Sequence, residues 1–384
     1  RYLPRFQLAD AELAARISVR DLLCHRPGLN SFGAVTLDAY TGEISEERYY
    51  HFLALERGGG GVAYSNVHFT LAGRVIEAVS GKSWRDWLAA EVFAPAGMSR
   101  SSGYAERMYA EDDAALPSVF QAGRISAAPL RKSDRTMHAA GGLGLSLEDG
   151  TRWLRVQLGR GELEGRRLLG AAATEATWAL QSQLKDDGGF GVSEGFGLGW
   201  QRGSYRGQLE LSHGGGYVGA ASYFCFLPEL ELGLVFLASG DFGAGALLRL
   251  MSSDVHERLL ADDAERDVLP QLRERLASER KREGAAAEAA RAARGLPLEL
   301  GVPLERCAGT FHNEWFGTLA VRCADGGLAA RLGDLALDVR GLAGGALQFA
   351  SPGSVDTTGK PVLAGGEVVA YELDLAGEAV RFTR

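Results

Sequence analysis

Residues 209–219 read Leu-Glu-Leu-Ser-His-Gly-Gly-Gly-Tyr-Val-Gly. Apolar and polar residues alternate up to His213, as in a half-buried β-strand, and three glycines follow. A strand that continues as glycine alone gives up side-chain packing, and the usual reason is that something lies close against its backbone. His213 is the side chain of this stretch that titrates near neutral pH. The stretch therefore predicts a strand at the substrate-facing edge of an active site.

The composition is that of a large, acidic globular protein. The chain has 384 residues, which suggests two or three domains, and it is 46% hydrophobic, so it can bury a sizeable core. A net charge of −8, from 41 basic and 49 acidic residues, argues against nucleic acid or an anionic membrane surface as the main partner. Since no run of about 18 apolar residues occurs, no transmembrane helix is expected.

The sequence carries no metal or cofactor motif. Its 7 histidines show no HExxH or other ligand spacing, and its 4 cysteines form no CxxC pair, so no metal site is expected. Residues 214–219 match GxGxxG, but strand-like residues follow where the nucleotide fingerprint needs a helix. No GxSxG elbow occurs, which disfavours an α/β-hydrolase. We therefore expect no cofactor.

Periodicity divides the chain into three predicted parts. Residues 1–260 mix helical and strand patterns, residues 261–300 form a charged helical linker, and residues 301–384 alternate with period two between glycine turns. The last part predicts a small barrel or sandwich. Within the first part we expect helices at residues 17–25, 67–79, 84–93, 147–158, 174–184 and 248–260, an irregular segment at 103–136, and an antiparallel meander of strands at 209–212, 221–227 and 232–238.

A second candidate stretch for the site is Tyr64-Ser65-Asn66, just before the helix expected at residues 67–79. Nearby cations can shift a tyrosine hydroxyl toward the phenolate, which then serves as a general base, and an asparagine two residues on can orient an amide or ester carbonyl. The alternative is structural: Tyr64 is a half-buried ring, and Ser65 or Asn66 caps the helix. Taken alone, the stretch favours the structural interpretation.

Several motifs occur in a fixed order along the first part of the chain. They are Ile-Ser-Val-Arg-Asp-Leu-Leu-Cys-His-Arg-Pro-Gly-Leu at 17–29, Tyr-Ser-Asn at 64–66, residues 75–88, 92–98 and 140–149, Phe-Gly-Leu-Gly-Trp at 196–200 and His-Gly-Gly at 213–215. In this order they resemble the serine β-lactamase-like family, which includes class C β-lactamases, D-alanyl-D-alanine carboxypeptidases and related esterases. The resemblance covers about residues 2–260.

The resemblance implies an α+β fold of the β-lactamase/transpeptidase type, with an antiparallel sheet, flanking helices and a helical subdomain. The region from Cys307 onward, with Cys-Ala-Gly-Thr-Phe at 307–311 and Gly-Thr-Leu at 317–319, resembles the lipocalin-like β-barrel domain often appended to this family. A small all-β barrel is therefore expected after the larger domain.

The resemblance also implies a role for each candidate residue. In the family, a serine from a Ser-x-x-Lys motif attacks a carbonyl and forms an acyl-enzyme, and Tyr64, with that lysine, would shuttle the proton. Asn66 would bind the amide side chain of the substrate, and His213 would support the electrostatics that a lysine supplies in relatives. The backbone N–H of Gly216 would be half of the oxyanion hole. The remaining substrate-binding residues are Gly214 and Gly215.

The nucleophile is the departure from the family pattern. The family places Ser-x-x-Lys upstream of residues 17–29, and this chain begins too late to hold it, so we expect an N-terminally truncated and inactive enzyme. Two Ser-x-x-Lys matches occur elsewhere. Ser182 to Lys185 is expected at the C-terminal end of a helix, where the dipole disfavours an alkoxide, and Ser278 to Lys281 in the charged linker. No nucleophile is therefore assigned within the chain.

Three functions remain open. The first is a serine hydrolase that cleaves an amide or ester of a small-molecule or peptide substrate, whether β-lactam, D-amino-acid peptide or carboxylic ester. The second is a non-catalytic homologue that binds such ligands in the same cleft, and the third is an assembly module centred on the C-terminal domain. The resemblance implies a periplasmic or extracellular location, while the substrate and the oligomeric state stay open.

Overall fold

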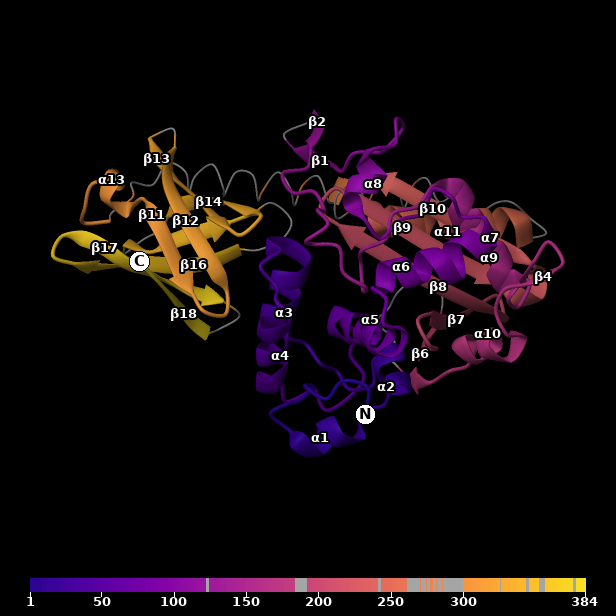
Figure 1. Ribbon diagram of the computed structural model, residues 1–384. Coiled ribbons are helices and arrows are strands. Elements are labelled where there is room, and N and C mark those ends of the chain that lie inside the picture. Colours follow the sequence, from indigo (N-terminus) through magenta and orange to yellow (C-terminus); the bar gives the residue numbers. More distant parts are fainter. Residues whose placement is uncertain are drawn as a thin grey trace.

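The structure is a computed structural model in which a mixed helix-and-sheet part and a C-terminal barrel lie side by side (Figure 1). It describes residues 1–121, 124–183, 192–240, 243–260, 300–324, 326–342, 345–351, 356–375 and 378–384, with isolated positions between 270 and 298. The linker expected at 261–300 thus lies almost entirely outside the described residues.

The stretch at 209–219 belongs to a six-stranded antiparallel sheet with the strand order β10-β9-β8-β7-β6-β5. Each strand pairs with its neighbour in sequence, which confirms the meander predicted for the last three strands. The glycines do not end β8, because residues 213–217 all pair with β9. The strands are β5 (Ser182–Gln183), β6 (Val192–Phe196), β7 (Gln201–Tyr205), β8 (Gln208–Tyr217), β9 (Ala220–Leu227) and β10 (Leu232–Ser239), with the short helix η3 (Pro228–Leu230) between the last two.

Helices α9 (Leu147–Leu158) and α11 (Gly243–Leu260) cover the two faces of this sheet. Alternate side chains of a strand point to opposite faces, so each face has its own apolar set. Leu211 and Phe226 belong to the cluster that α9 contacts, whereas Cys225 belongs to the cluster on the side of α11. Both helices were predicted from the sequence, and the structure confirms them.

The predicted helix at residues 17–25 is α2 (Val19–Leu23). The Ser18 side chain accepts from the backbone N–H of Asp21, and the Asp21 side chain accepts from that of Ser18, so a capping box fixes the start of the helix. The other helical segments of the first 120 residues are α1 (Ala11–Arg16), α3 (Phe32–Thr36), η1 (Leu37–Thr41), α4 (Glu46–Leu55), α6 (Trp84–Leu88), η2 (Ala89–Phe93), α7 (Ala94–Ala96) and α8 (Ala105–Tyr109).

The predicted helix at residues 67–79 is α5 (Asn66–Ser80). Ser65 caps its start, and Gly81, at φ 70°, ends it in the left-handed conformation that favours glycine. None of the helices in the described part of the chain is long and apolar enough to cross a membrane.

The helix predicted at residues 174–184 is wrong in its second half. Helix α10 (Ala171–Trp178) ends early, and Ser182 lies in strand β5. The backbone N–H of Gln181 donates to the carbonyl of Phe196, where β5 joins β6, so pairing with the sheet overrides the local helical preference. The segment 103–136 is also more ordered than expected, since it holds α8 and the hairpin β1 (Ser118–Gln121) and β2 (Arg124–Ala127); a second small hairpin is formed by β3 (Glu162–Leu163) and β4 (Arg166–Arg167).

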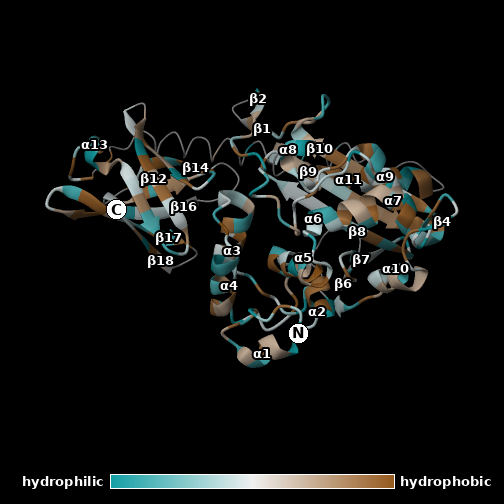
Figure 2. Ribbon diagram, in the orientation of Figure 1, coloured by the Kyte–Doolittle hydropathy of each residue, from teal (hydrophilic) through white to brown (hydrophobic). Residues whose placement is uncertain are grey.

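The C-terminal strands β11 to β18 close into a barrel, which confirms the predicted all-β domain. Buried and exposed residues alternate along β14, and Figure 2 shows both hydrophobic and hydrophilic residues on β12. Phe311, Phe349, Tyr371 and Phe382 are fully buried, so side chains fill the interior. The elements are α13 (Leu304–Cys307), β11 (Gly309–Asn313), β12 (Gly317–Ala324), β13 (Gly327–Leu332), β14 (Leu335–Gly341), β15 (Leu347–Ala350), β16 (Asp356–Ala364), β17 (Glu367–Leu375) and β18 (Glu378–Thr383).

The barrel packs against α3 and α4, which stand between it and the rest of the molecule (Figure 1). His51 of α4 stacks on Trp315, with 3.5 Å between ring centroids and 1° between ring planes. Phe52 meets Phe316 edge to face with centroids 4.9 Å apart. Buried residues of both parts belong to one hydrophobic cluster, so the two parts share a core.

A turn of the barrel also holds a segment of the larger part. The backbone N–H of Asp334 donates to the carbonyl of Thr41 at 2.8 Å. The Asp334 carboxylate accepts from Nη1 of Arg135 and from Oγ of Ser133, each at 3.3 Å. The barrel therefore fixes residues that lead into the cavity described next.

Candidate active site

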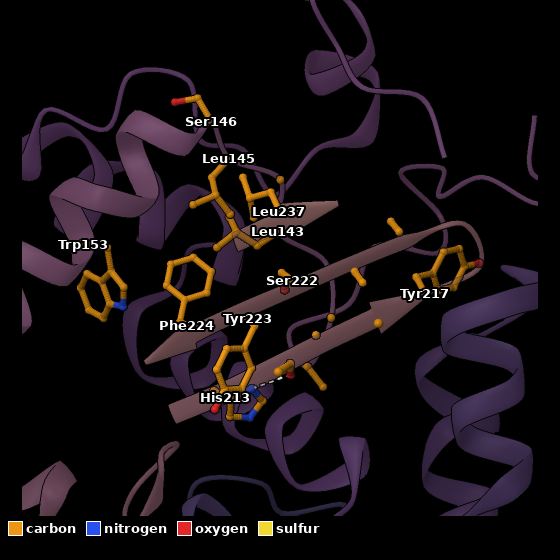
Figure 3. Close-up of a pocket in the computed structure, with 18 of the residues that line it drawn as sticks. Leu143, Leu145, Ser146, Trp153, His213, Tyr217, Ser222, Tyr223, Phe224 and Leu237 are labelled. Carbon is orange, nitrogen blue, oxygen red and sulfur yellow. Dashed lines mark hydrogen bonds between the residues drawn. The ribbon is translucent and has the colours of Figure 1, made fainter. Parts of the chain in front are cut away.

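A cavity of about 1970 Å³ lies beside β8. Its walls come from β8 and β9, from the start of α5 and from the loop that leads into α9. Figure 3 shows His213 and Tyr217 at the two ends of the glycine stretch of β8, with Phe224 on the neighbouring strand. All the predicted site residues line this one cavity, namely Tyr64, Asn66, His213, Gly214, Gly215 and Gly216.

Strand β8 has an open edge beside the cavity. Strand β7 pairs with residues 208–212 of β8 and no further, whereas β9 pairs with residues 211–217. Within the described part of the chain, the glycine stretch is therefore bonded to a neighbouring strand on one side alone. Backbone groups that point to the other side are available to a ligand.

The hairpin register tells which backbone groups face this open edge. The turn residues 206–207 have φ values of 49° and 79°, as in a two-residue type I′ turn. Such a turn makes Tyr205 and Gln208 a hydrogen-bonded pair, so the even-numbered residues of β8 direct their N–H and C=O groups toward the side of β7. The N–H groups of Gly214 and Gly216 consequently point to the open edge.

Tyr64 and Asn66 face this edge from the start of α5. The Tyr64 hydroxyl donates to Oδ1 of Asn66 at 3.3 Å, which leaves the Asn66 amide nitrogen free to donate to a carbonyl oxygen. Burial within the cavity raises the pKa of Tyr64. The expectation that nearby cations shift Tyr64 toward the phenolate is thus not met by the described residues of this chain.

His213 lies opposite Tyr64, with 6.2 Å between the two ring centroids. Its Nδ1–H donates to the carbonyl of Gly214 at 2.8 Å, so Nε2 is left to accept. Burial lowers the pKa of His213, and a neutral imidazole at this position acts as a hydrogen-bond partner rather than as a cation.

A buried pair of histidines behind Tyr64 escaped sequence reasoning. Nδ1 of His25 lies 2.9 Å from Nδ1 of His68. The N–H of Leu29 donates to Nε2 of His68, so His68 carries its proton on Nδ1 and donates it to His25. Burial lowers the pKa of His25 to about 3 and that of His68 to about 4, so both rings are neutral at pH 7.

This histidine pair positions the Tyr64–Asn66 turn. The N–H of Ser65 donates to Nδ1 of His25 at 3.2 Å, and the His25 ring packs on the Tyr64 ring with 4.6 Å between centroids. His25 itself has a φ of 57°, which a non-glycine residue adopts where its surroundings hold it. The sequence offered one signal, since His25 lies in the first family-like motif.

Neither serine of the two Ser-x-x-Lys matches is among the described residues that line the cavity. The Ser182 hydroxyl is buried and donates to the carbonyl of Cys24 at 2.6 Å, and Lys185 lies outside the described residues. Ser278 and Lys281 are exposed helical residues in the charged segment. Among the described residues, the serines that line the cavity are not hydrogen-bonded to a lysine; they are Ser146, Ser222 and Ser239.

The described part of the chain contains no group of three or more His, Cys, Asp or Glu side chains able to hold a metal ion. The polar groups that face the cavity are hydrogen-bond donors and acceptors. These are the N–H of Gly216, the amide of Asn66, the hydroxyl of Tyr64 and Nε2 of His213, which together suit a polar carbonyl compound laid along β8.

The chain is similar to known proteins in both sequence and fold. The sequence model of the family described as Beta-lactamase matches residues 1–250. Penicillin-binding protein 4 of Amycolatopsis lactamdurans is 27% identical over 247 residues, which cover 62% of this chain and 63% of that protein. This chain thus spans less than two thirds of that relative's length.

Two solved structures share the fold. The octameric penicillin-binding protein homologue from Pyrococcus abyssi matches with a TM-score of 0.55 and 19% identity, over 96% of this chain and 78% of that one. A D-stereospecific amidohydrolase from Streptomyces sp. matches with a TM-score of 0.52 and 19% identity, over 64% of this chain and 75% of that one. At such identities the likeness concerns the fold alone.

Proposed function

The chain belongs to the beta-lactamase family, a family of serine hydrolases, and from that premise we propose that it supplies the substrate-binding part of a serine hydrolase that cleaves an amide or ester bond. The observation that carries this proposal is the convergence of Tyr64, Asn66, His213 and Gly216 on the open edge of β8. These residues come from two stretches that are far apart in sequence, and each residue faces the cavity with a polar group suited to a carbonyl substrate.

In the proposed reaction, a serine hydroxyl attacks the substrate carbonyl carbon and its proton passes to Tyr64 or to a lysine beside it. The carbonyl oxygen becomes an oxyanion, which the N–H of Gly216 stabilises. Collapse of this intermediate breaks the amide or ester bond, and the leaving amine or alcohol takes up the proton. Water then attacks the acyl-enzyme, which releases the acid and restores the serine.

We place the nucleophilic serine on a segment outside these 384 residues. A pocket for a small ligand measures about 300–1,000 Å³. The cavity beside β8 measures about 1970 Å³, and apolar side chains such as Phe69, Leu145 and Trp153 form much of its wall. A space of this size and character suits a packed polypeptide segment together with a substrate, and so supports a Ser-x-x-Lys helix seated against α5 and β8.

Covalent labelling tests the proposal. A fluorescent penicillin or a fluorophosphonate should label the protein made from the complete reading frame, and peptide mapping should place the label on a serine upstream of Arg1. The 384-residue chain alone should stay unlabelled. A complete reading frame without an upstream Ser-x-x-Lys, or a label on Ser182 or Ser278, would contradict this assignment.

One observation favours a second candidate, a homologue that binds such ligands without turnover. Within the described residues, no serine on the cavity wall is hydrogen-bonded to a lysine. This candidate predicts reversible binding of penicillin to the complete protein with no covalent product. Dialysis of the labelled sample separates the two, because an acyl-enzyme on the hydrolase retains the label while a reversible complex loses it.

The proposal extends to location and substrate class. We place the protein in the periplasm or outside the cell, because that is where penicillin-binding relatives act, and we assign it a small-molecule or peptide substrate. The mass of the purified protein in solution would show whether it assembles into oligomers. The homologue from Pyrococcus abyssi is described as octameric.

A further inference from the structure

A lysine stands at the far end of the open strand from His213. Nζ of Lys132 lies 4.2 Å from the centroid of the Tyr217 ring, at the end of β8. The Tyr217 ring stacks on Tyr40, with 5.5 Å between centroids and 19° between planes. All three side chains line the cavity, so an ammonium group framed by two tyrosines forms part of its wall.

The backbone holds Lys132 in place without using all of its donors. Nζ donates to the carbonyls of Ala39 at 3.3 Å and Thr136 at 2.8 Å. An ammonium group has three donors, so one remains for a ligand. The Tyr217 hydroxyl donates to the same carbonyl of Ala39, at 3.0 Å, which fixes the ring beside the ammonium. The arrangement is therefore rigid before any ligand binds.

No carboxylate forms an ion pair with Lys132 among the described residues. The nearest acidic influence on Lys132 comes from Asp38, a buried group whose carboxylate accepts from the hydroxyl of Thr70. Burial raises the pKa of Asp38 and lowers that of Lys132 to about 7. Both shifts reflect the cost of burying charge without close compensation, and an anionic ligand beside Nζ would supply that compensation.

The position of Lys132 along β8 relates it to the reacting bond. Side chains of His213 and Tyr217 share one face, about 13 Å apart at about 3.3 Å per residue. Tyr217 follows directly after Gly216, whose N–H is the proposed oxyanion donor. A substrate with its carbonyl at that N–H therefore reaches Lys132 with a chain of only a few bonds.

We propose that Lys132, framed by Tyr40 and Tyr217, is a subsite for a carboxylate that the substrate carries a few bonds from its scissile carbonyl. The inference rests on the proposed function, because it takes the carbonyl to lie at the N–H of Gly216. A single ammonium with one free donor matches a singly charged carboxylate better than a phosphate, which needs several donors at once. Hydrolases with this subsite would select acidic amides or esters over neutral ones.

A matched pair of small probes tests this subsite on the 384-residue chain. Glutaramate carries one carboxylate and one primary amide, and glutaramide carries two amides on the same carbon chain. Saturation-transfer NMR titrations at pH 6 should show glutaramate binding about tenfold more tightly, because the ammonium and the carboxylate are then both charged. Equal affinities for the two probes at pH 6 would overturn the subsite.

Two variants attribute the preference to Lys132. Lys132→Met should reduce the affinity ratio of the two probes to about one. The matched control is Lys82→Met, since Lys82 is exposed beside Glu91 and does not line the cavity; it should keep the ratio. A preference that survives in Lys132→Met, with far-ultraviolet circular dichroism unchanged, contradicts the assignment.

A measurement on the unmodified chain covers the case in which Lys132→Met does not fold. The preference for glutaramate should fall toward one between pH 7 and pH 9, as the ammonium loses its proton. The other groups near Lys132 are Asp38, Tyr40, Tyr109, His138 and Tyr217. Burial raises the pKa of the three tyrosines and lowers that of His138 to about 3, so these four groups move away from this window. Burial also raises the pKa of Asp38, and ionisation of Asp38 would weaken carboxylate binding in the same direction as loss of the Lys132 proton. A ratio that stays constant from pH 6 to pH 9 rules Lys132 out.

The binding test and the covalent-labelling test can fail separately. Probe binding to this chain needs no nucleophile, whereas covalent labelling needs one. A preference for glutaramate without any labelling of the complete protein would leave the subsite standing and remove the hydrolase. Labelling of the complete protein without a preference for glutaramate would support the hydrolase and remove the subsite.

Discussion

His25 and His68 share a single proton between their Nδ1 atoms, which lie 2.9 Å apart in the interior behind the candidate site. Protonation of both nitrogens would place two N–H donors face to face. The pair also holds the N–H of Ser65 and thereby the turn that carries Tyr64 and Asn66. Acid should therefore disturb the fold and the site through the same two side chains.

The first prediction concerns stability in acid. The pKa values of His25 and His68 are lowered in the fold to about 3 and about 4, whereas unfolded histidine has a pKa of about 6.5. The unfolded state thus binds more protons below pH 6.5, so stability is fully present above that pH and falls toward pH 4 by up to about 1.4 kcal/mol per pH unit for each histidine. Urea unfolding across pH 4 to 8 measures this slope.

The matched variants are His68→Gln and His312→Gln. Glutamine at 68 can accept from Leu29 and donate to His25 without titrating, so the slope should decrease by about the contribution of one proton. His312 is exposed on the barrel and away from this pair, so His312→Gln controls for the exchange of a histidine for glutamine. Identical slopes for the original chain and His68→Gln would show that the pair does not govern acid stability.

The second prediction concerns Tyr64. Burial raises its pKa in this chain, so its hydroxyl should titrate above pH 10. The difference between alkaline absorbance titrations of the original chain and of Tyr64→Phe isolates this one group. In the complete protein, a lysine beside Tyr64 should lower that pKa, and Tyr64→Phe should slow covalent labelling by about 10²-fold or more. Tyr2→Phe, at an exposed position, serves as the control.

The third prediction removes one backbone N–H. Proline at 216 lacks the N–H that points to the open edge, and no bond to β9 is lost, because Gly216 directs its backbone groups away from that strand. Gly216→Pro should therefore retain the fold and reduce labelling of the complete protein by about 10²–10³-fold. Gly216→Ala keeps the N–H, and its Cβ meets nothing within 4 Å, so it should label more nearly as the original does.

Should Gly216→Pro label as fast as Gly216→Ala, the N–H of Gly216 is not an oxyanion donor. Unfolding of Gly216→Pro at a lower urea concentration would instead show that the N–H is part of the ladder with β9. The two variants thus test the strand register and the catalytic role separately.

The fourth prediction concerns the joint between the barrel and α4. Trp315→Ala removes the ring stacked on His51, so the free energy of unfolding should fall by about 1–3 kcal/mol, from a lost aromatic pair and lost apolar burial. Trp315→Phe retains a ring and should lose less than half of this. Urea unfolding followed by circular dichroism measures both losses. Equal losses for the two variants would show that an aromatic ring stacked on His51 does not contribute to the free energy of unfolding.

The same variant tests whether the barrel unfolds with the larger part. Because buried residues of both parts form one cluster, Trp315→Ala should shift a single transition rather than split it in two. Two separated transitions in the original chain would mean that the shared core does not couple them.

Much of this architecture was accessible from the sequence because it rests on local signals. Alternation predicted β8, β9 and β10, Ser18 and Gly81 marked helix ends, and period two predicted the barrel. The motifs around Tyr64 and His213 predicted which residues line the cavity. These features depend on side chains within a few residues of one another.

The features that the sequence did not reveal depend on distant partners. Ser182 is a strand residue because Phe196 pairs with it, and the local composition favours a helix. His25 meets His68, 43 positions further along the chain, only after the segment between them has folded back. Lys132 reaches the Tyr217 ring only because the segment that carries it folds against the end of β8. Neither the hydrophobic periodicity of the sequence nor the spacing of its motifs predicts such contacts.

The open edge of β8 also affects how this protein interacts with other polypeptide chains. A strand of glycines with one open edge, and with no side chain to obstruct a neighbour, is a template on which the edge strand of another chain can add. The groups that suit it to a substrate backbone thus also expose it to misassembly and aggregation whenever the cavity stands empty. Two opposed requirements therefore act on this strand. Its edge must be accessible to the ligand, and the same edge must be protected from other polypeptides.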